Sequence, residues 1–464
     1  MIASMSLSQV KEACQGCLYG KDVRFNRVVT DSRDVKKGDL YLALKGERFD
    51  GNAYASDACS AGAVGTVLSD LTMLKSSAML EHNSVLHVPD TRYALGKIAG
   101  HCRKHFSKPV IAITGSSGKT TTRKMLGAIL SERGAVCMTA GNQNNEIGVP
   151  LTLLDLQEGQ SAAVIEIGAR KVGDINYLGE FVQPDISLLL NAGLAHVGEF
   201  GSYQNIVRAK SEIYSILKPD GLAVVNLDDK ASAQWLDGLK SKRVITYSCA
   251  NLSRDDHIQA DVTAANICVD SKSSRFDLCF QGESEVVFLP AAGEHNVANA
   301  LAAAAAAIAV GVSLSEIVKG LASYQPERGR LHFKSENESL TWIDDSYNAN
   351  PVSMLAALRV LAEQNGRRIA VLGEMGELGN EAETYHLKLA DEAAHMPIDR
   401  FYLIGPFAKS MADIIGAHAF VKSSKADIAR ALKDDIKGVS VVLLKGSRSA
   451  AMEEVANLLQ EVEK

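Results

Sequence analysis

The sequence predicts an α/β protein of three domains, with a phosphate-binding loop on a mostly parallel sheet in the central domain. Its 464 residues are enough for two to four domains, each with its own core. Apolar strand-like runs alternate with helical runs, a pattern typical of a parallel sheet covered by helices on both faces. At residues 112–122, AITGSSGKTTT, an apolar run passes through a glycine-rich turn into a helical pattern.

The composition indicates an ordinary globular protein, with 46% hydrophobic and 22% charged residues. A net charge of -6 argues against nucleic acid or an anionic membrane as the main partner. We expect no signal peptide, and the longest apolar run, residues 300–312, is too short to span a bilayer. The eight cysteines have no framework spacing, which favours a reducing cytoplasm, and we interpret Cys14 and Cys17 as two plain thiols.

Residues 1–88 are the predicted first domain, a small α/β unit. Strands are expected at 23–30, 39–44, 65–68 and 84–88, and a helix at 54–61. The polar turns between them carry Ser32, Arg33, Lys45 and Asp50, and binding residues often lie in such loops. Turn formation and solvated charge are the alternative interpretation of these residues.

Residues 89–324 are the predicted central domain, which begins with a helix capped by Asp90 or Thr91. After the strand of the glycine-rich segment, further strands are expected at 136–139, 162–167, 186–191, 222–226 and 244–247. Residues 257–289 have turn-like polar breaks and an apolar alternation at Phe276, Leu278 and Phe280, which predict an antiparallel addition to the sheet. Two helices, the first rich in alanine, are expected to close the domain.

Residues 325–464 are the predicted C-terminal domain, in which a second doubly wound unit follows the linker YQPERGR at residues 324–330. Strands are expected at 340–344, 368–372, 401–404 and 439–444, with helices between them. The first of these helices carries Pro351 near its start, where proline is tolerated. This domain has no phosphate loop of its own.

The glycine-rich segment has the parts of a phosphate cradle. Gly115 and Gly118 let the backbone curl around an anion, Lys119 can reach the outer phosphates and Thr120 can ligate Mg²⁺. The usual P-loop spacing requires a glycine at position 113, where Ile113 stands, so this loop is a shortened variant. The alternative is a glycine-serine turn before a helix with a solvated lysine.

Candidate partners of this loop follow the neighbouring strands. Glu166 ends an apolar strand, where a hard cation would satisfy its charge, although a structural salt bridge would do so as well. His196 and Lys210 taken alone have the alternatives of a loop histidine and a surface lysine. Asn296 and Asn299 share one helix face and could present amides to a base, or could simply decorate the helix. The residues alone predict a multidomain ATP-using enzyme.

Near these residues the chain resembles the Mur ligase family over almost its whole length. The matching segments are TGSSGKTT, NNEIGVP, the Glu166 strand, the His196 loop, AKSEIY, GEHNVANALAA, ERGR and DDSYNANP. Within the family, TDSR with ALKGERFDG, DDSYNANP, LGEMGELG and KGSRS look most like the member that adds D-alanyl-D-alanine to UDP-N-acetylmuramoyl-tripeptide. The DNPR-type signature of the member that adds a diamino acid is missing from the sequence, and DDSYNANP stands at that place.

The resemblance implies an N-terminal domain for the UDP-sugar, a central ATP-binding domain and a Rossmann-like C-terminal domain that closes over them. It also implies the roles of individual residues. The loop residues Gly115, Ser116, Ser117, Gly118, Lys119, Thr120 and Thr121 would hold ATP, with Asn145, Asn296, Asn299, Arg330, Asp345 and Tyr347 around the nucleotide. Thr120, Glu166, His196 and Lys210 would bind two Mg²⁺ ions, Lys210 as a carbamate, because an ammonium repels Mg²⁺ whereas a carbamate is an oxygen ligand. Lys119, His196, Lys210 and Arg330 would be the catalytic groups, and Ser32, Arg33 and Gly46 would face the uridine end of the acceptor.

The resemblance also implies a stepwise reaction in a cytoplasmic, monomeric enzyme of peptidoglycan precursor synthesis. The tripeptide carboxylate would attack the γ-phosphate of ATP to give an acyl phosphate and ADP, and the dipeptide amine would then displace phosphate. The rival interpretations are another Mur-type or a folylpolyglutamate-type ligase, a P-loop kinase, and a nucleotide-binding module without catalysis.

Overall fold

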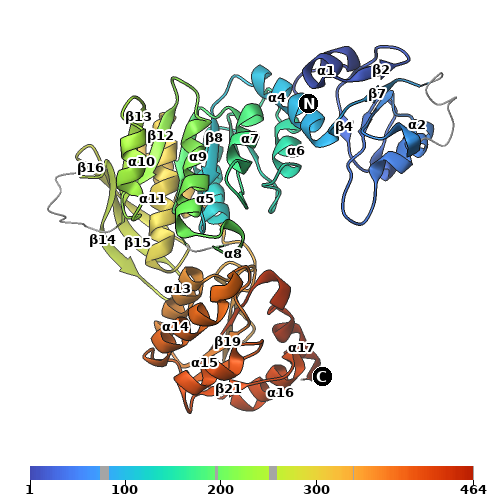
Figure 1. Cartoon of the computed structure of the whole chain (residues 1–464). Coiled ribbons are helices and arrows are strands. Elements are labelled where there is room, and N and C mark those ends of the chain that lie inside the picture. The colour runs from blue at the N-terminus through green and yellow to red at the C-terminus, as the bar shows by residue number, and fades with distance from the viewer. Residues whose placement is uncertain (74–82, 194–196, 250–258, 338, 463–464) are drawn as a thin grey trace.

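The computed structural model describes residues 1–73, 83–193, 197–249, 259–337 and 339–462, which form three α/β bodies along the chain (Figure 1). Among these residues the main sheets have five strands in the N-terminal body, nine in the central body and six in the C-terminal body. The predicted α/β class is confirmed. The domain boundaries at residues 88 and 324 stay predictions. Within the described ranges no helix is long and apolar enough to cross a bilayer.

The N-terminal body contains the sheet β2-β7-β6-β5-β4 and a short β1-β3 pair. Its elements are β1 Met5–Ser6, α1 Leu7–Cys14, β2 Cys17–Tyr19, β3 Arg24–Phe25, β4 Val28–Val29, η1 Ser32–Asp34, β5 Leu40–Leu42, η2 Gly51–Tyr54, α2 Ala55–Ser60, β6 Gly65–Leu68, η3 Leu71–Met73 and β7 Val85–His87.

The single strand predicted over residues 23–30 is wrong, because β3 pairs with β1 whereas β4 pairs with β5. In one straight strand Arg27 would share the buried face of Phe25 and Val29. The chain bends between the two short strands instead, and the Arg27 guanidinium lies 2.7 Å from the Asp39 carboxylate.

The central body is built on the sheet β16-β15-β14-β13-β12-β11-β8-β10-β9. Its elements are α4 Thr91–His105, β8 Val110–Thr114, α5 Lys119–Ser131, β9 Val136–Met138, α6 Gly148–Leu154, β10 Ala162–Glu166, α7 Asp174–Val182, β11 Ile186–Leu189, α8 Val197–Phe200, α9 Tyr203–Ser215, β12 Leu222–Asn226, α10 Ser232–Gly238, β13 Arg243–Ser248, β14 Val262–Val269, β15 Ser274–Phe280, β16 Glu283–Leu289, α11 Glu294–Ala309 and α12 Leu314–Ala322. Neighbouring strands from β9 to β14 run parallel, and β15 and β16 form the predicted antiparallel addition.

Strand β8 shows why this sheet needs helices on both faces. Its five residues are all buried, and successive side chains point to opposite faces. Val110 and Ala112 join one core cluster, which includes residues of α4, α6, α7 and α9, and Ile111 and Ile113 join the other, which includes residues of α5, α11 and α12. The continuous apolar run in the sequence is therefore a strand between two helical layers.

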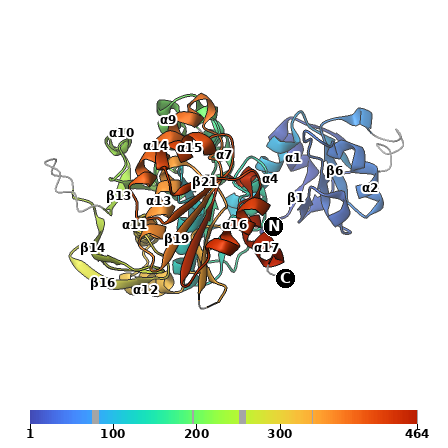
Figure 2. The same ribbon diagram turned by 90° about the horizontal axis from the view of Figure 1, so that it is seen from below.

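The C-terminal body contains the sheet β17-β18-β22-β19-β20-β21 and lies against the central body on the side of α8 (Figure 1). Seen from below, it overlaps the central body, and the N-terminal body lies to one side (Figure 2). Its elements are β17 His332–Ser335, β18 Leu340–Asp345, α13 Pro351–Ala362, β19 Arg367–Leu372, η4 Gly379–Glu381, α14 Ala382–Ala394, β20 Arg400–Leu403, α15 Ala408–Ile415, β21 Ala419–Val421, α16 Lys425–Asp435, β22 Ser440–Lys445, η5 Arg448–Ala450 and α17 Glu454–Val462. The predicted strands are present, and the edge strands β17 and β21 are additions, whose residues are all half-buried or exposed.

The order of the central sheet determines where a ligand can bind. Strand β8 lies between β10 and β11. The strands that follow it in the chain are therefore added first on one side of β8, as β9 and β10, and then on the other side, from β11 onward. Such a switch point opens a crevice at the carboxyl ends of the strands. The glycine-rich loop after β8 and Glu166 at the end of β10 meet at this crevice.

Helix α5, which begins at the glycine-rich loop, is held by a close contact with α12. A Cβ atom at Gly320 would lie 2.3 Å from the Ile129 Cα atom, and that backbone cannot move aside cheaply. We expect Gly320→Ala to lower stability by about 1–3 kcal/mol through overpacking. Urea unfolding followed by circular dichroism measures this, with Gly238→Ala as the control because nothing lies within 4 Å of its Cβ. Equal midpoints for the two variants would contradict the prediction.

Candidate active site

The loop between β8 and α5 is shaped by two glycines that a larger residue could not replace. Gly118 has a φ of +81°, and a Cβ there would lie 2.4 Å from the Asn299 Oδ1 atom. A Cβ at Gly115 would lie 2.9 Å from the Leu190 Cβ. The first N–H groups of α5 have no acceptor within the helix and carry its positive dipole end, so the loop can bind an anion.

Lys119 lies at the start of α5 and folds back over this loop. Its Nζ donates a hydrogen bond to the Gly115 carbonyl at 2.7 Å. Burial lowers the pKa of Lys119, and the nearby Glu166 carboxylate opposes that shift. Asn191, two residues after β11, holds the backbone of this loop in place. Its Oδ1 accepts hydrogen bonds from the Ser116 and Ser117 N–H groups at 3.1 and 3.0 Å.

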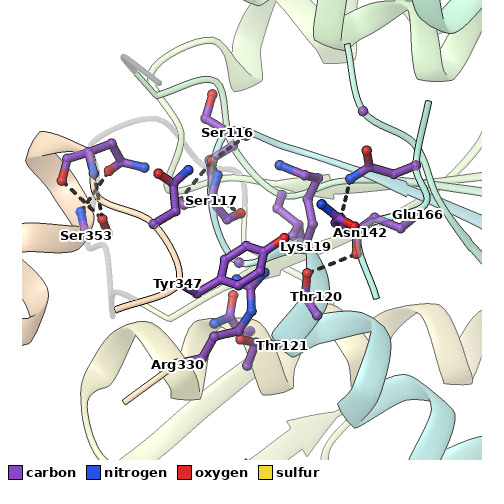
Figure 3. Close-up of a pocket in the computed structure, with 18 of the residues that line it drawn as sticks. Ser116, Ser117, Lys119, Thr120, Thr121, Asn142, Glu166, Arg330, Tyr347 and Ser353 are labelled. Carbon is purple, nitrogen blue, oxygen red and sulfur yellow. Dashed lines mark hydrogen bonds between the residues drawn. The ribbon is translucent and has the colours of Figure 1, made fainter. Parts of the chain in front are cut away.

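Glu166 is a buried carboxylate, 2% exposed, with partners from three directions. Thr120 Oγ1 donates to it at 3.1 Å (Figure 3). Asn144 Nδ2 donates to it at 2.8 Å, and Arg123 Nε lies 3.6 Å away. The sequence left a metal and a salt bridge as alternatives for this residue, and Arg123 supplies a buried cation beside it. The hydroxyl and the carboxylate are also the hard oxygen donors that Mg²⁺ prefers.

Lys210, on α9, is 2% exposed and lies in the same cavity. Burial, and then repulsion from Lys119, lowers the pKa of the Lys210 amine to about 7. The surface position left open from the sequence is therefore wrong for Lys210. His196 lies outside the described residues, and within them no group of three His, Cys, Asp or Glu side chains could hold a metal.

The C-terminal body supplies the opposite wall of the cavity. The Arg330 guanidinium lies 4.1 Å from the centre of the Tyr347 ring, and Figure 3 shows this pair in one cavity with Lys119 and Thr120. Asp345 is bonded to Lys445 Nζ at 2.5 Å and accepts from the Leu331 N–H at 3.0 Å. Burial raises the pKa of Asp345, and Lys445 opposes this shift.

Most of the predicted residues meet in one cavity of about 1040 Å³ between the central and C-terminal bodies. Those that line it are Ser116, Ser117, Gly118, Lys119, Thr120, Thr121, Asn145, Glu166, Lys210, Asn296, Asn299, Arg330, Asp345 and Tyr347. Asn296 and Asn299 are bonded to each other at 3.3 Å, and Asn145 Oδ1 accepts from the Gly148 N–H at the start of α6. Gly115 does not line the cavity itself, but its carbonyl accepts the hydrogen bond from Lys119 Nζ.

The predicted residues of the N-terminal body lie apart from this cavity. The Arg33 side chain is 87% exposed and pairs with Asp31, which lowers the pKa of that carboxyl to about 2. Ser32 is in the same short helix, and Gly46 closes a turn by donating to the Phe49 carbonyl at 3.0 Å. One link exists, because the cavity residue Arg92 donates from Nη2 to the Lys45 carbonyl at 3.0 Å. A uridine role for Ser32, Arg33 and Gly46 stays a prediction.

The structure adds cavity residues that the sequence did not single out, namely Asn144, Asn191, Lys445 and Glu377. Asn144 is adjacent to the predicted Asn145, and the order of the residues cannot say which of two neighbours faces Glu166. Lys445 carried a usable signal, since it ends an apolar strand just as Glu166 does, and ligands bind at such strand ends.

A substitution at Gly118 tests whether the loop is a phosphate cradle. In Gly118→Ala the new Cβ would clash with Asn299 and the φ of +81° would be strained, so the loop must shift. We expect the Kd for ADP to rise at least about tenfold, which is about 1.4 kcal/mol. Isothermal titration calorimetry measures it, with Gly159→Ala as the control in open space. An unchanged Kd in Gly118→Ala would remove the loop from nucleotide binding.

Comparison with known protein families gives matches to all three bodies. Residues 24–103 match the Mur ligase family catalytic domain, 113–307 the Mur ligase middle domain and 329–448 the Mur ligase glutamate ligase domain. The UDP-N-acetylmuramoyl-tripeptide--D-alanyl-D-alanine ligase of Escherichia coli is 40% identical over 99% of both chains. The enzyme of that name from Bacillus subtilis is 33% identical over 94% of this chain and 93% of its own.

Solved structures give the same result. A crystal structure of MurF from Acinetobacter baumannii superposes with a TM-score of 0.91 at 38% identity, covering 99% of both chains. MurF ligase from Thermotoga maritima in complex with ADP gives a TM-score of 0.82 at 28% identity, covering 94% of this chain and 97% of its own. The folylpolyglutamate synthase of Mycobacterium tuberculosis, at 17% identity and a TM-score of 0.60, shares the fold alone. With matches across the central and C-terminal bodies and relatives aligned from end to end, the chain belongs to the Mur ligase family.

Proposed function

We propose that the protein is an ADP-forming ligase that joins D-alanyl-D-alanine to UDP-N-acetylmuramoyl-tripeptide in peptidoglycan precursor synthesis. The observation that carries the proposal is the convergence of Lys119, Glu166 and Lys210 in one cavity closed by Arg330 and Asp345. Full-length relatives that carry this activity in their names support the choice of substrates. We expect a monomeric, cytoplasmic enzyme.

ATP is the nucleotide that the cavity would bind. The N–H groups at the start of α5 and the Lys119 ammonium would hold its phosphates, and Asn296 and Asn299 would lie along the base. The ADP complex of the related T. maritima protein supports this assignment. Arg330 and Tyr347 would approach the nucleotide from the C-terminal body.

The chemistry requires activation of the acceptor, because a carboxylate is a poor electrophile. The terminal carboxylate of the tripeptide attacks the γ-phosphate, a P–O bond breaks, and ADP leaves from the new acyl phosphate. The amine of D-alanyl-D-alanine then attacks the acyl carbon, loses a proton, and phosphate leaves as the amide bond forms. Lys119 and Arg330 offset the negative charge that accumulates when two anionic substrates meet.

The donors around Thr120 fit Mg²⁺. The Thr120 hydroxyl and the Glu166 carboxylate are 3.1 Å apart and lie beside the phosphate loop. Bound Mg²⁺ would neutralise phosphate charge and polarise the γ-phosphoryl group. Thr120, Glu166, His196 and the carbamate of Lys210 would hold two such ions.

Closure of the cavity would protect the acyl phosphate from hydrolysis. The opposing wall comes from a different body and is joined to the central body through the linker that contains Pro326. A change in the backbone conformation of that linker would move the C-terminal body as a unit and so open or close the site. Water exclusion also strengthens the interactions of Lys119 and Arg330 with the phosphates.

The direct test is incubation with ATP, Mg²⁺, UDP-N-acetylmuramoyl-tripeptide and D-alanyl-D-alanine, followed by measurement of ADP, phosphate and product mass. We expect equal amounts of ADP and phosphate and a product heavier than the acceptor by the dipeptide less water. Phosphate transferred to the acceptor would indicate a kinase. Phosphate release with no such gain in mass would exclude the proposed ligase activity.

A carbamate on Lys210 would be visible by NMR. The neutral amine attacks CO₂ and releases one proton, and a pKa of about 7 makes much of this amine neutral near pH 7. With ¹³C-bicarbonate we expect a carbamate resonance that grows as the pH rises from 6 to about 8, and its loss together with turnover in Lys210→Ala. Lys272→Ala is the control, because Lys272 is exposed in the turn between β14 and β15. Full, bicarbonate-independent activity of Lys210→Ala would contradict the carbamate.

A further inference from the structure

The loop of residues 373–379, which carries most of the LGEMGELG motif, links the C-terminal sheet to the central body. It follows β19 and ends where η4 contacts α8, at the junction of the two bodies (Figure 1). Of this loop, Glu377 lines the active-site cavity.

Hydrogen bonds fix this loop at several points, and the Gly373 N–H at its start donates to the Lys445 carbonyl at 2.8 Å. The Met375 N–H donates to His386 Nε2 at 2.9 Å, and the Glu374 carbonyl accepts from the Ser447 N–H at 2.8 Å. The Glu377 carbonyl accepts from the Gly198 N–H at 3.2 Å, and this bond crosses from the C-terminal to the central body. The loop is therefore held by both bodies at once.

The backbone at the crossing is both strained and tightly packed. Glu377 has a φ of +64°, a conformation that costs a residue with a side chain about 1–3 kcal/mol and tends to occur at functional sites. A Cβ at Gly198 would lie 2.6 Å from the Gly379 nitrogen, so no other residue fits without separating the two segments. This contact, together with the hydrogen bond, sets where Glu377 lies.

Glu377 lines the same cavity as Lys119 and Thr120 of the phosphate loop. Among the described residues of the lining, the C-terminal body supplies two carboxylates, Asp345 and Glu377, and Asp345 is paired with Lys445. Glu166 is engaged with Thr120, Asn144 and Arg123 on the central body. Glu377 thus brings negative charge to the cavity from the C-terminal body.

We propose that Glu377 binds the ammonium of the incoming amine substrate and that the Gly198–Gly379 contact holds it in position to do so. This inference rests on the proposed function, in which the second substrate enters with a free ammonium. A carboxylate is the complement of an ammonium, and a charge-assisted bond between them gives affinity and orientation. A cation bound at Glu377 would lie in the cavity that Lys119 and the phosphate loop also line.

The test compares Michaelis constants for the two substrates in the complete ligase assay. We expect Glu377→Gln to raise the KM for D-alanyl-D-alanine about tenfold, as for loss of a bond to a charged group, and to leave the KM for ATP within about twofold. Glu377→Asp, which keeps the charge, should recover part of the affinity. Gly198→Ala should also raise the dipeptide KM, because its Cβ must displace Gly379.

Matched controls are Glu383→Gln, at an exposed position of α14, and Gly238→Ala, with open space around its Cβ, both with wild-type constants. Thermal unfolding of each variant identifies loss of fold. A dipeptide KM within about twofold of wild type in Glu377→Gln, or equal rises for dipeptide and ATP, would overturn the inference. Wild-type enzyme that forms no dipeptide product would instead overturn the proposed function.

Discussion

Burial of the Lys119 and Lys210 ammonium groups in one cavity is the constraint around which the site is arranged. Burial lowers the pKa of both amines, and repulsion from Lys119 lowers the pKa of Lys210 further. Two desolvated cations in one cavity are costly unless one loses its proton or an anion lies between them. The protein already favours loss of the proton at Lys210. Polyphosphate, or conversion of that amine into an anion, would relieve the remaining repulsion, so the cavity is electrostatically suited to an anionic ligand.

Sheet geometry explains how groups from distant parts of the sequence reach this point. Strands β10, β8 and β11 are neighbours and run parallel, so the segments that follow them leave at the same edge. The loop after β8, Glu166 at the end of β10 and Asn191 after β11 therefore meet, although up to 76 positions separate them in the chain. Position 113 of β8 is Ile113 and not a glycine, so the apolar run of the strand continues up to the loop. The turn is therefore confined to residues 115–118. In this shortened loop the backbone N–H groups of Ser116 and Ser117 are held by hydrogen bonds to the Asn191 side chain.

The sequence predicted strands best where they are buried. Strand β12 of the central body, buried except for Asn226, and strand β6 of the N-terminal body, buried throughout, were predicted residue for residue. The region around Phe25 was predicted less well, since local alternation there could not show that Arg27 needs Asp39 as a partner. The same limit applies within the site. Lys119 and Thr120 could be assigned from spacing, whereas the choice of Asn144 for Glu166, and the pairing of Asp345 with Lys445 across 100 residues, depend on tertiary contacts that no local pattern encodes.

Charge pairing at Asp345 also explains how the C-terminal body can contribute a wall to a charged cavity at modest cost. Asp345 and Lys445 end the neighbouring parallel strands β18 and β22, and they neutralise each other within the C-terminal body. A lone buried carboxylate facing the phosphates would oppose nucleotide binding, and a lone buried ammonium would add to the repulsion already present from Lys119 and Lys210. As a pair they fix the segment of residues 345–348 through the Lys445 bonds to Asp345 and to the Asn348 carbonyl. That segment carries Tyr347, whose ring supports Arg330, so a neutral pair inside one body orients the cation that faces the other.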